Sequence, residues 1–244
     1  MANDIELCQL YKAFDDHQVL QGLDLGIEEG EILTILGGSG TGKSVLLRMM
    51  IGLLKPDAGR ILIEGEDIVP LPEDALLKVR RKVGMLFQGA ALFDSLTVEE
   101  NVAFPLREHT VMTLAEIRNR VGEVLALVGM DGTEAKYPTE LSGGMRKRVG
   151  LARAIALTPR IVLYDEPTTG LDPRNVEKIN ELITDLRAKL RVTSVVVTHD
   201  LQSAFRISDR VALLAEGRIA GTGSPAEIGK SQNHVVQEFL AGHF

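Results

Sequence analysis

One stretch decides the fold of this chain: Gly37-Gly38-Ser39-Gly40-Thr41-Gly42-Lys43-Ser44. It matches the pattern G-x-x-x-x-G-K-[ST], between a buried-strand pattern at residues 32–36 and a helix pattern at residues 45–54. Glycines let backbone N–H groups curl around phosphate oxygens, and the positive end of a helix dipole attracts the same anion. The sequence therefore predicts a nucleotide phosphate-binding loop, formed by these residues together with Val45.

The charged and hydroxyl groups near this loop predict ATP chemistry with Mg²⁺. Lys43 is expected to hold the β- and γ-phosphates, and Ser44 to ligate Mg²⁺, a hard cation that prefers oxygen. Two carboxylates, Asp165 and Glu166, follow an apolar run at residues 161–164. Asp165 is expected to bind Mg²⁺ through water, and Glu166 to deprotonate or orient the water that attacks the γ-phosphate.

Strand-like and helix-like runs alternate along most of the chain, which is typical of a parallel sheet covered by helices. The clearest strands lie at residues 32–36, 161–164 and 194–198. Each leads into polar residues at its C-terminal end, where ligands of open α/β sheets bind. From about Gly89 to Pro159 the patterns are mainly helical, with Thr113 and Glu116 as a capping box. We expect this stretch to be a helical subdomain inserted into an α/β core.

Two further segments have readable patterns. Asp172 stands in the N-cap position before Pro173, which predicts the start of a helix. Near the C-terminus, residues 211–215 and 218–221 predict a hairpin, followed by a helix from Pro225.

Composition excludes several other classes. The 244 residues carry 27 Lys plus Arg against 34 Asp plus Glu, a net charge of −7. Such a chain lacks the broad basic field of a sequence-independent nucleic-acid binder, so no nucleic-acid partner is expected. Its longest uncharged stretches are 11 residues, too short to span a bilayer. The start lacks signal-peptide features and Cys8 is a single cysteine, so a reducing cytoplasm is expected.

A second anion site is predicted at Leu141-Ser142-Gly143-Gly144-Met145. Ser142 is a good N-cap, and a helix pattern continues behind the two glycines. One nucleotide can reach both this site and the phosphate loop only if two chains meet head to tail, so we expect a C2 homodimer closed by two ATP molecules. With these motifs in this order, the sequence resembles the ATP-binding cassette (ABC) ATPases over essentially its whole length.

The resemblance implies the fold and the domain organisation. The expected fold is an α/β P-loop NTPase with a RecA-like parallel-sheet core, an N-terminal antiparallel β part and an inserted helical subdomain. Residues 1–244 then form one ABC ATPase domain, with 1–88 and 160–244 as the nucleotide-binding core and 89–159 as the helical signature subdomain.

The resemblance also implies roles for single residues. Phe14 matches the aromatic side chain that stacks on adenine, with Tyr11 as the alternative. Gln88 matches the glutamine that touches Mg²⁺ and the attacking water and joins the core to the helical subdomain. His199 matches the histidine that hydrogen-bonds the γ-phosphate. Asp172 matches the loop that crosses the dimer, a role compatible with its N-cap position.

The segment after Gln88 indicates which cassette this is. The runs QGAALFDSLTV and ENVAFPLREH, with LSGGMRKRVGLARAIA, resemble the ATPases of Mla-type and Mce-associated lipid transporters. This resemblance implies two copies on the cytoplasmic face of the inner membrane, beneath an integral permease that works with an MCE-domain protein and moves phospholipid between membranes.

Two surfaces in this region have alternative interpretations. Leu92, Phe93 and Phe104 form either an apolar patch for a partner helix, with Arg107 and Glu108 at its rim, or part of the subdomain core. The basic positions after the signature are expected on a solvated face, where they could also favour anionic lipid headgroups. They are Arg146, Lys147, Arg148 and Arg153.

Three other protein classes share part of this pattern. The nearest is the ATPase of an importer for amino acids or other small solutes, against which only the segment after Gln88 argues. A DNA-repair or chromosome-organising cassette would carry long coiled coils between the two phosphate motifs, a span of only about fifty residues here. A small-molecule P-loop kinase would have no use for the motif at Ser142.

Overall fold

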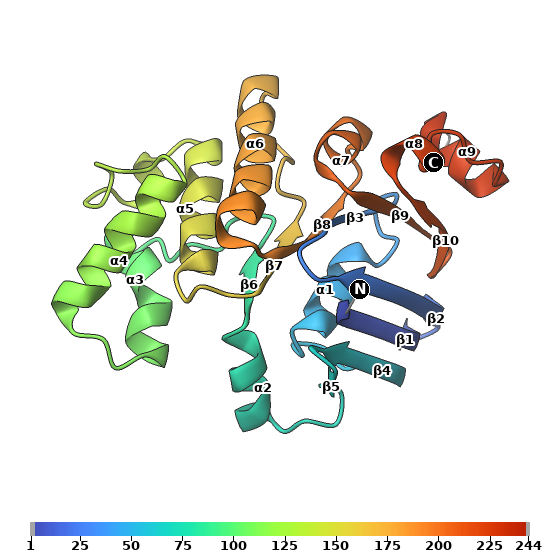
Figure 1. The fold of residues 1–244 in the computed structure, drawn as a ribbon, viewed down its shortest axis with the longest axis horizontal. Coiled ribbons are helices and arrows are strands. Elements are labelled where there is room, and N and C mark those ends of the chain that lie inside the picture. Colours follow the sequence, from blue (N-terminus) through green and yellow to red (C-terminus); the bar gives the residue numbers. More distant parts are fainter. Residues whose placement is uncertain (1–2, 243–244) are drawn as a thin grey trace.

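The computed structural model describes residues 3–242, which form two β-sheets and a group of helices (Figure 1). The larger sheet has the strand order β10-β9-β3-β8-β7-β6. Its strands are β3 (Ile32–Leu36), β6 (Val83–Leu86), β7 (Ile161–Asp165), β8 (Thr193–Thr198), β9 (Arg210–Ala215) and β10 (Arg218–Gly223). All neighbouring pairs are parallel except β9 with β10, which form the predicted C-terminal hairpin. The predicted parallel core is therefore confirmed.

A smaller antiparallel sheet lies beside the core (Figure 1) and has the order β2-β1-β4-β5. Its strands are β1 (Asn3–Phe14), β2 (His17–Glu28), β4 (Ala58–Ile63) and β5 (Glu66–Asp67). Buried aliphatic side chains of this sheet pack with helix α1 (Lys43–Met50) and with the parallel strands. Helix α1 is thus packed between the two sheets, and this packing positions its N-terminus at the phosphate loop.

The region predicted to be helical contains α3 (Val98–His109), α4 (Leu114–Leu127), a short 3₁₀ turn at Pro138–Glu140, and α5 (Gly143–Ile155). Thr113 and Glu116 form the predicted capping box, and Thr97 and Glu100 form a second one. Figure 1 shows α3, α4 and α5 as a group at one side of the parallel sheet. Their apolar faces share one buried cluster with β6, β7 and α6 (Pro173–Leu190), so the helices are packed onto the core rather than separate from it.

Alternation along the strands separates the two faces of the parallel sheet. Leu33, Ile35 and Leu163 pack with α1 and the small sheet, while Val162 and Tyr164 pack with α5 and α6. The remaining helices are α2 (Glu73–Arg80), α7 (Leu201–Ile207), α8 (Pro225–Ile228) and α9 (His234–Leu240).

Some predicted helix boundaries were wrong. The helix after the phosphate loop begins at Lys43 rather than at residue 45, and it ends at Met50 rather than at residue 54. Gly52 has a φ of 64°, and this left-handed residue ends the helix. The helix that starts at Pro225 is only four residues long, and α9 follows it as a separate element.

Candidate functional site

The phosphate loop connects β3 to α1 and brings backbone N–H groups to the start of the helix. Gly42 is the N-cap of α1, with φ 98° in the left-handed region. A Cβ atom at this position would lie 2.6 Å from Cγ1 of Val19, so both the conformation and the space require glycine. The last glycine of the predicted loop is therefore required by the turn that leads into α1.

Lys43 lies inside this loop and is buried. Its Nζ donates hydrogen bonds to the carbonyl oxygens of Gly37 and Gly38, each at 2.8 Å, and stands 3.6 Å from Oε1 of Glu166. Burial lowers the pKa of Lys43, and the nearby carboxylates of Glu166 and Asp165 oppose that shift. The ammonium is thus held where α1 begins, the point at which a helix terminus favours an anion.

Ser44 and Asp165 meet although 121 residues separate them, because α1 starts beside the end of β7. Ser44 Oγ donates a 2.7 Å hydrogen bond to Oδ1 of Asp165, and Asp165 is buried. Within residues 3–242, no group of three or more His, Cys, Asp or Glu side chains could hold a metal ion. A hydroxyl and one carboxylate do fit Mg²⁺, which commonly binds through one or two carboxylates and the phosphates of its substrate.

Glu166 directly follows β7, and its backbone has the left-handed φ of 47°. Its Oε2 accepts hydrogen bonds from Thr169 Oγ1 at 3.0 Å and Thr198 Oγ1 at 3.2 Å. Nδ1 of His199 lies 3.0 Å from the same oxygen. The end of β7 and the end of β8 therefore hold one carboxylate in place beside Lys43. The sequence did not single out these two threonines. Thr198 is the last residue of β8, and Thr169 lies three positions after Glu166, so their closeness to strand ends was the available signal.

Lys147 was expected on a solvated face, and this expectation was wrong. The residue is only 6% exposed, and its Nζ donates a 2.8 Å hydrogen bond to the carbonyl oxygen of Glu166. Burial lowers the pKa of Lys147 to about 8, against the opposing attraction of Glu166 and Asp165. Lys147 was assigned to the wrong face of the helix because a run of basic residues in the sequence does not show which positions point inward.

The other basic residues of this run also bind carbonyl oxygens. Arg146 donates to Leu141 at 2.6 Å, and Arg148 to Gly129 at 2.9 Å. Arg153 reaches across to the carbonyl oxygens of Ala90 and Ala91, at 2.9 and 2.8 Å. These side chains satisfy backbone acceptors at loops, so they stabilise the helical region in addition to any surface role.

A cleft of about 500 Å³ brings most of the predicted site residues together. Those that line it are Phe14, Ser39, Gly40, Gly42, Lys43, Ser44, Val45, Gln88, Glu166 and His199. Of the two candidate aromatics, Phe14 lines the cleft. The Tyr11 hydroxyl instead lies over Gly22, where an added Cβ would come within 2.7 Å of it.

The residues of the second predicted anion site, Ser142, Gly143 and Gly144, which form the signature motif, do not line this cleft. Ser142 is the N-cap of α5, and its Oγ accepts a hydrogen bond from the N–H of Met145 at 3.3 Å, as predicted for a helix start. Gly143 borders a smaller cavity of about 170 Å³, which Gln88 and Lys147 also line. Asp172 is exposed and caps α6. One chain therefore presents two separate helix N-termini, with Gln88 bordering both cavities.

Residues 20–169 match the family model described as ABC transporter. This chain belongs to that family. It is 44% identical over 242 residues to the "Probable ribonucleotide transport ATP-binding protein mkl" of Mycobacterium tuberculosis, spanning 99% of this chain and 67% of the relative. It is 41% identical to the "Intermembrane phospholipid transport system ATP-binding protein MlaF" of Haemophilus influenzae, spanning 98% of this chain and 91% of the relative.

Solved ABC cassettes have the same fold. The cbiO1 cassette of Clostridium perfringens, described as part of the ABC transporter complex cbiONQ, matches with a TM-score of 0.87 and 31% identity, over 98% of this chain and 96% of that one. The bacterial ABC transporter cassette MJ0796, solved as a dimer, matches with a TM-score of 0.84 and 36% identity, over 91% and 98%.

The cassette is an ATPase that uses ATP with Mg²⁺, as the sequence predicted, and it is the ATPase subunit of a transporter. MJ0796 is also solved as a dimer in a post-hydrolysis state bound to ADP and Pi, in agreement with the predicted assembly of two cassettes. Among the helices described over residues 3–242, none is long and apolar enough to cross a bilayer.

Proposed function

We propose that this cassette powers the movement of phospholipid between the inner and outer membranes, working as a homodimer beneath a membrane permease. The observation that carries the proposal is the match to the intermembrane phospholipid transport ATPase of Haemophilus influenzae, which spans 91% of that relative. The segment at residues 88–109 resembles Mla-type cassettes and also supports the proposal. This segment lines part of the groove where we propose that the permease docks.

The proposed catalytic cycle uses the residues of the cleft. Phe14 stacks on adenine, the loop at residues 37–45 surrounds the phosphates, and Lys43 neutralises part of their charge. Ser142, Gly143 and Gly144 of one protomer close over the nucleotide held by its partner, and Asp172 lies at the crossing between them. The separation of the two helix N-termini in one chain supports this arrangement.

Hydrolysis is proposed to depend on Glu166, which accepts a proton from the attacking water or orients it. His199 contributes a hydrogen bond to the γ-phosphate, and its Nδ1 lies 3.0 Å from Oε2 of Glu166. Ser44, Asp165 and Gln88 would hold Mg²⁺, which supplies charge neutralisation at the β- and γ-phosphates when it is bound.

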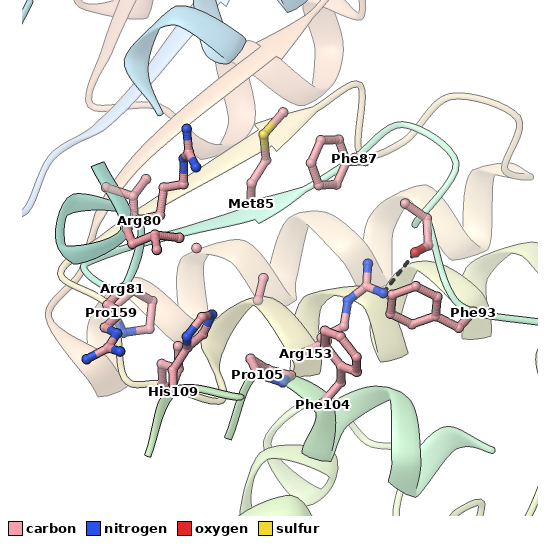
Figure 2. Close-up of a pocket in the computed structure, with 16 residues that line it drawn as sticks. Arg80, Arg81, Met85, Phe87, Phe93, Phe104, Pro105, His109, Arg153 and Pro159 are labelled. Carbon is pink, nitrogen blue, oxygen red and sulfur yellow. Dashed lines mark hydrogen bonds between the residues drawn. The ribbon is translucent and has the colours of Figure 1, made fainter. Parts of the chain in front are cut away.

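A groove of about 410 Å³ is the proposed docking site for the permease, and Figure 2 shows its lining. Phe93 and Phe104 lie at one end with ring centroids 4.9 Å apart, and the guanidinium of Arg153 stands 5.7 Å from the Phe93 ring. The two rings are 44% and 40% exposed, whereas Leu92 is partly buried against the helical core. Of the apolar patch considered from sequence, the phenylalanines therefore face the groove and Leu92 does not.

The charge of this groove indicates the character of its partner. Arg81 and His109 line the end opposite the phenylalanines in Figure 2, together with Arg80, whose guanidinium already pairs with Glu73. An amphipathic permease helix with an apolar face and acidic residues at one end fits such a lining. The groove lies between β6, α2, α3 and α5, so an occupant would touch the nucleotide-binding core (residues 1–88 and 160–244) and the helical subdomain (89–159) together.

An importer of small solutes is the alternative function. The "Methionine import ATP-binding protein MetN" of Brucella abortus is 42% identical over 97% of this chain, although the match spans only 64% of that relative. Because ATPase subunits share their nucleotide chemistry, only the partner distinguishes the two functions.

Native purification tests the proposal. Membranes are solubilised mildly, the cassette is isolated through an N-terminal tag, and proteins and lipids that accompany it are identified by mass spectrometry. We expect a multi-span permease, an MCE-domain protein and bound phospholipid, at the cytoplasmic face of the inner membrane. A permease with a solute-binding protein instead would replace the lipid proposal with the importer.

A further inference from the structure

Lys147 is a buried cation in the second turn of α5. Its ammonium donates to the carbonyl oxygen of Glu166, a buried hydrogen bond of 2.8 Å between residues 19 positions apart. An ammonium taken out of water is costly unless it is hydrogen-bonded, so this contact is an important one for the side chain. Its partner is the backbone of the proposed catalytic residue.

The backbone of Glu166 requires support from its surroundings. A left-handed conformation at a non-glycine residue is unfavourable and persists where neighbouring groups hold it. The N–H of Glu166 donates to the carbonyl oxygen of Val197 at 3.0 Å. Its own carbonyl oxygen accepts from Lys147 and, over a longer 3.3 Å, from the N–H of Thr169. Strand β8 thus holds one side of the residue, and helix α5 the other.

The carboxylate projects from this held backbone into its own set of contacts with Thr169, Thr198 and His199. Catalytic groups work only within about 0.5 Å and 10–20° of the productive geometry. A turn of the Glu166 backbone would carry the carboxylate out of that range even if the contacting side chains were unchanged.

We propose that Lys147 is a positioning residue for hydrolysis: its hydrogen bond holds the backbone of Glu166 so that the carboxylate points at the nucleotide cleft. This inference rests on the proposed role of Glu166. It also connects two parts of the machinery, because α5 begins at Ser142, the helix start that faces the partner protomer's nucleotide in the proposed dimer. A displacement of α5 would reach the carboxylate through this one bond.

Three variants test the inference in the purified full-length cassette. Lys147→Met keeps an unbranched side chain of similar length and removes the donor. Lys147→Gln keeps a neutral N–H donor on a slightly shorter side chain. Arg148→Met is the matched control, since Arg148 is on the same helix and also binds a backbone carbonyl, that of Gly129, away from Glu166. Steady-state kcat and KM for ATP are measured, together with ATP binding and the midpoint of thermal unfolding.

We expect Lys147→Met to lower kcat at least tenfold, with the KM for ATP within about twofold of the wild-type value. Lys147→Gln should recover a substantial part of kcat. Arg148→Met should have the kcat of the wild type. A purely structural role would lower thermal stability and ATP binding together, without a selective fall in kcat. The inference is overturned if Lys147→Met keeps more than half of the wild-type kcat, or if Lys147→Gln is no better than Lys147→Met.

Glu166→Gln is measured beside these variants to separate the two proposals. If Glu166→Gln remains active, the role of Glu166 itself fails and Lys147 has nothing to position. If Glu166→Gln is inactive and Lys147→Met is not, only the positioning role fails. Should Lys147→Met fold poorly, Lys147→Gln is compared with Arg148→Gln at pH 7. A fall in kcat confined to Lys147→Gln supports the positioning role. Wild-type kcat in both variants, or an equal fall in both, overturns it.

Discussion

Ser44 Oγ and Asp165 Oδ1 lie 2.7 Å apart and share a hydrogen bond. The first residue belongs to the first turn of α1, and the second ends β7, so the contact joins the phosphate loop to the carboxyl edge of the sheet. Two oxygen atoms that can act as metal ligands therefore already lie together beside the site proposed for the phosphates. Little rearrangement of these side chains is needed for them to bind a hard cation.

We expect Ser44→Ala to weaken the use of Mg²⁺ more than the binding of nucleotide. The Mg²⁺ concentration for half-maximal ATPase activity should rise by roughly tenfold or more, the scale on which loss of a group at a metal site lowers affinity. ATP binding measured in EDTA is the internal control and should change little. An unaltered Mg²⁺ dependence would remove Ser44 from the proposed set.

Glu166→Gln should bind ATP and scarcely hydrolyse it. A general base contributes about 10²–10⁴ in rate, and the amide of glutamine cannot accept the proton. The turnover of purified protein is compared with that of Glu177→Gln, which alters an exposed carboxylate paired with Arg206. Retention of more than a tenth of the wild-type turnover would contradict the role of Glu166.

Phe14→Ala should lower the affinity for ATP, whereas Tyr11→Ala should not. Stacking of a base on an aromatic ring contributes about 1–3 kcal/mol, so a loss of about tenfold in affinity is expected from the residue that lines the cleft. Equilibrium binding of a fluorescent ATP analogue measures both variants. The reverse order of effects would move the stacking role to Tyr11.

Phe104→Ser should release the cassette from its permease while leaving basal ATPase activity unchanged. The ring lies in the groove beside Phe93 and is 40% exposed, so the substitution removes apolar contact area for a partner and disturbs little of the core. Co-purification with the permease is scored against Leu53→Ser, a similarly exposed apolar residue outside the groove lining. Equal recovery of the permease with both variants would argue against docking at this groove.

Lys147 should make the free energy of unfolding of the metal-free and nucleotide-free cassette vary with pH in the alkaline range. Its pKa is lowered by burial from 10.5 in the unfolded chain to about 8 in the folded one. Between these values unfolding takes up a proton, so stability rises with pH from about 8 and is penalised fully below that value. Relative to Lys147→Gln, the free energy of unfolding of the wild type should rise by about 2 kcal/mol between pH 8 and pH 10.

Chemical denaturation at a series of pH values measures this difference. Lys43 also has a lowered pKa, but it is present in both proteins, and its contribution is expected to cancel in the comparison. Parallel curves for the two proteins across this range would contradict the buried, desolvated environment of Lys147.

Much of the nucleotide cleft followed from local sequence. The phosphate loop is a contiguous stretch in which each glycine and Lys43 has a short-range reason, and apolar strands such as residues 161–164 indicate where their polar ends will lie. The capping box at Thr113 and the N-caps at Ser142 and Asp172 were readable for the same reason, since a cap involves residues only three positions apart. Helix ends were less predictable, as the stop at Gly52 shows.

Sequence by itself therefore determined the α/β class, the parallel core and the phosphate loop, because these depend on patterns that repeat or act within a few positions. Phe14, Gln88 and His199, which also line the cleft, were placed by resemblance to the ABC family and not by a local pattern. Tertiary structure alone decided three other features: the hydrogen bond from Lys147 to Glu166, the hydrogen bond from Thr198 to Glu166, and the division of the apolar patch between groove and core. These depend on which face of α5 or α3 turns inward and on which strands become neighbours. Burial and long-range contact set both, and residues 19 or 32 positions apart carry no local mark of the partner they will meet.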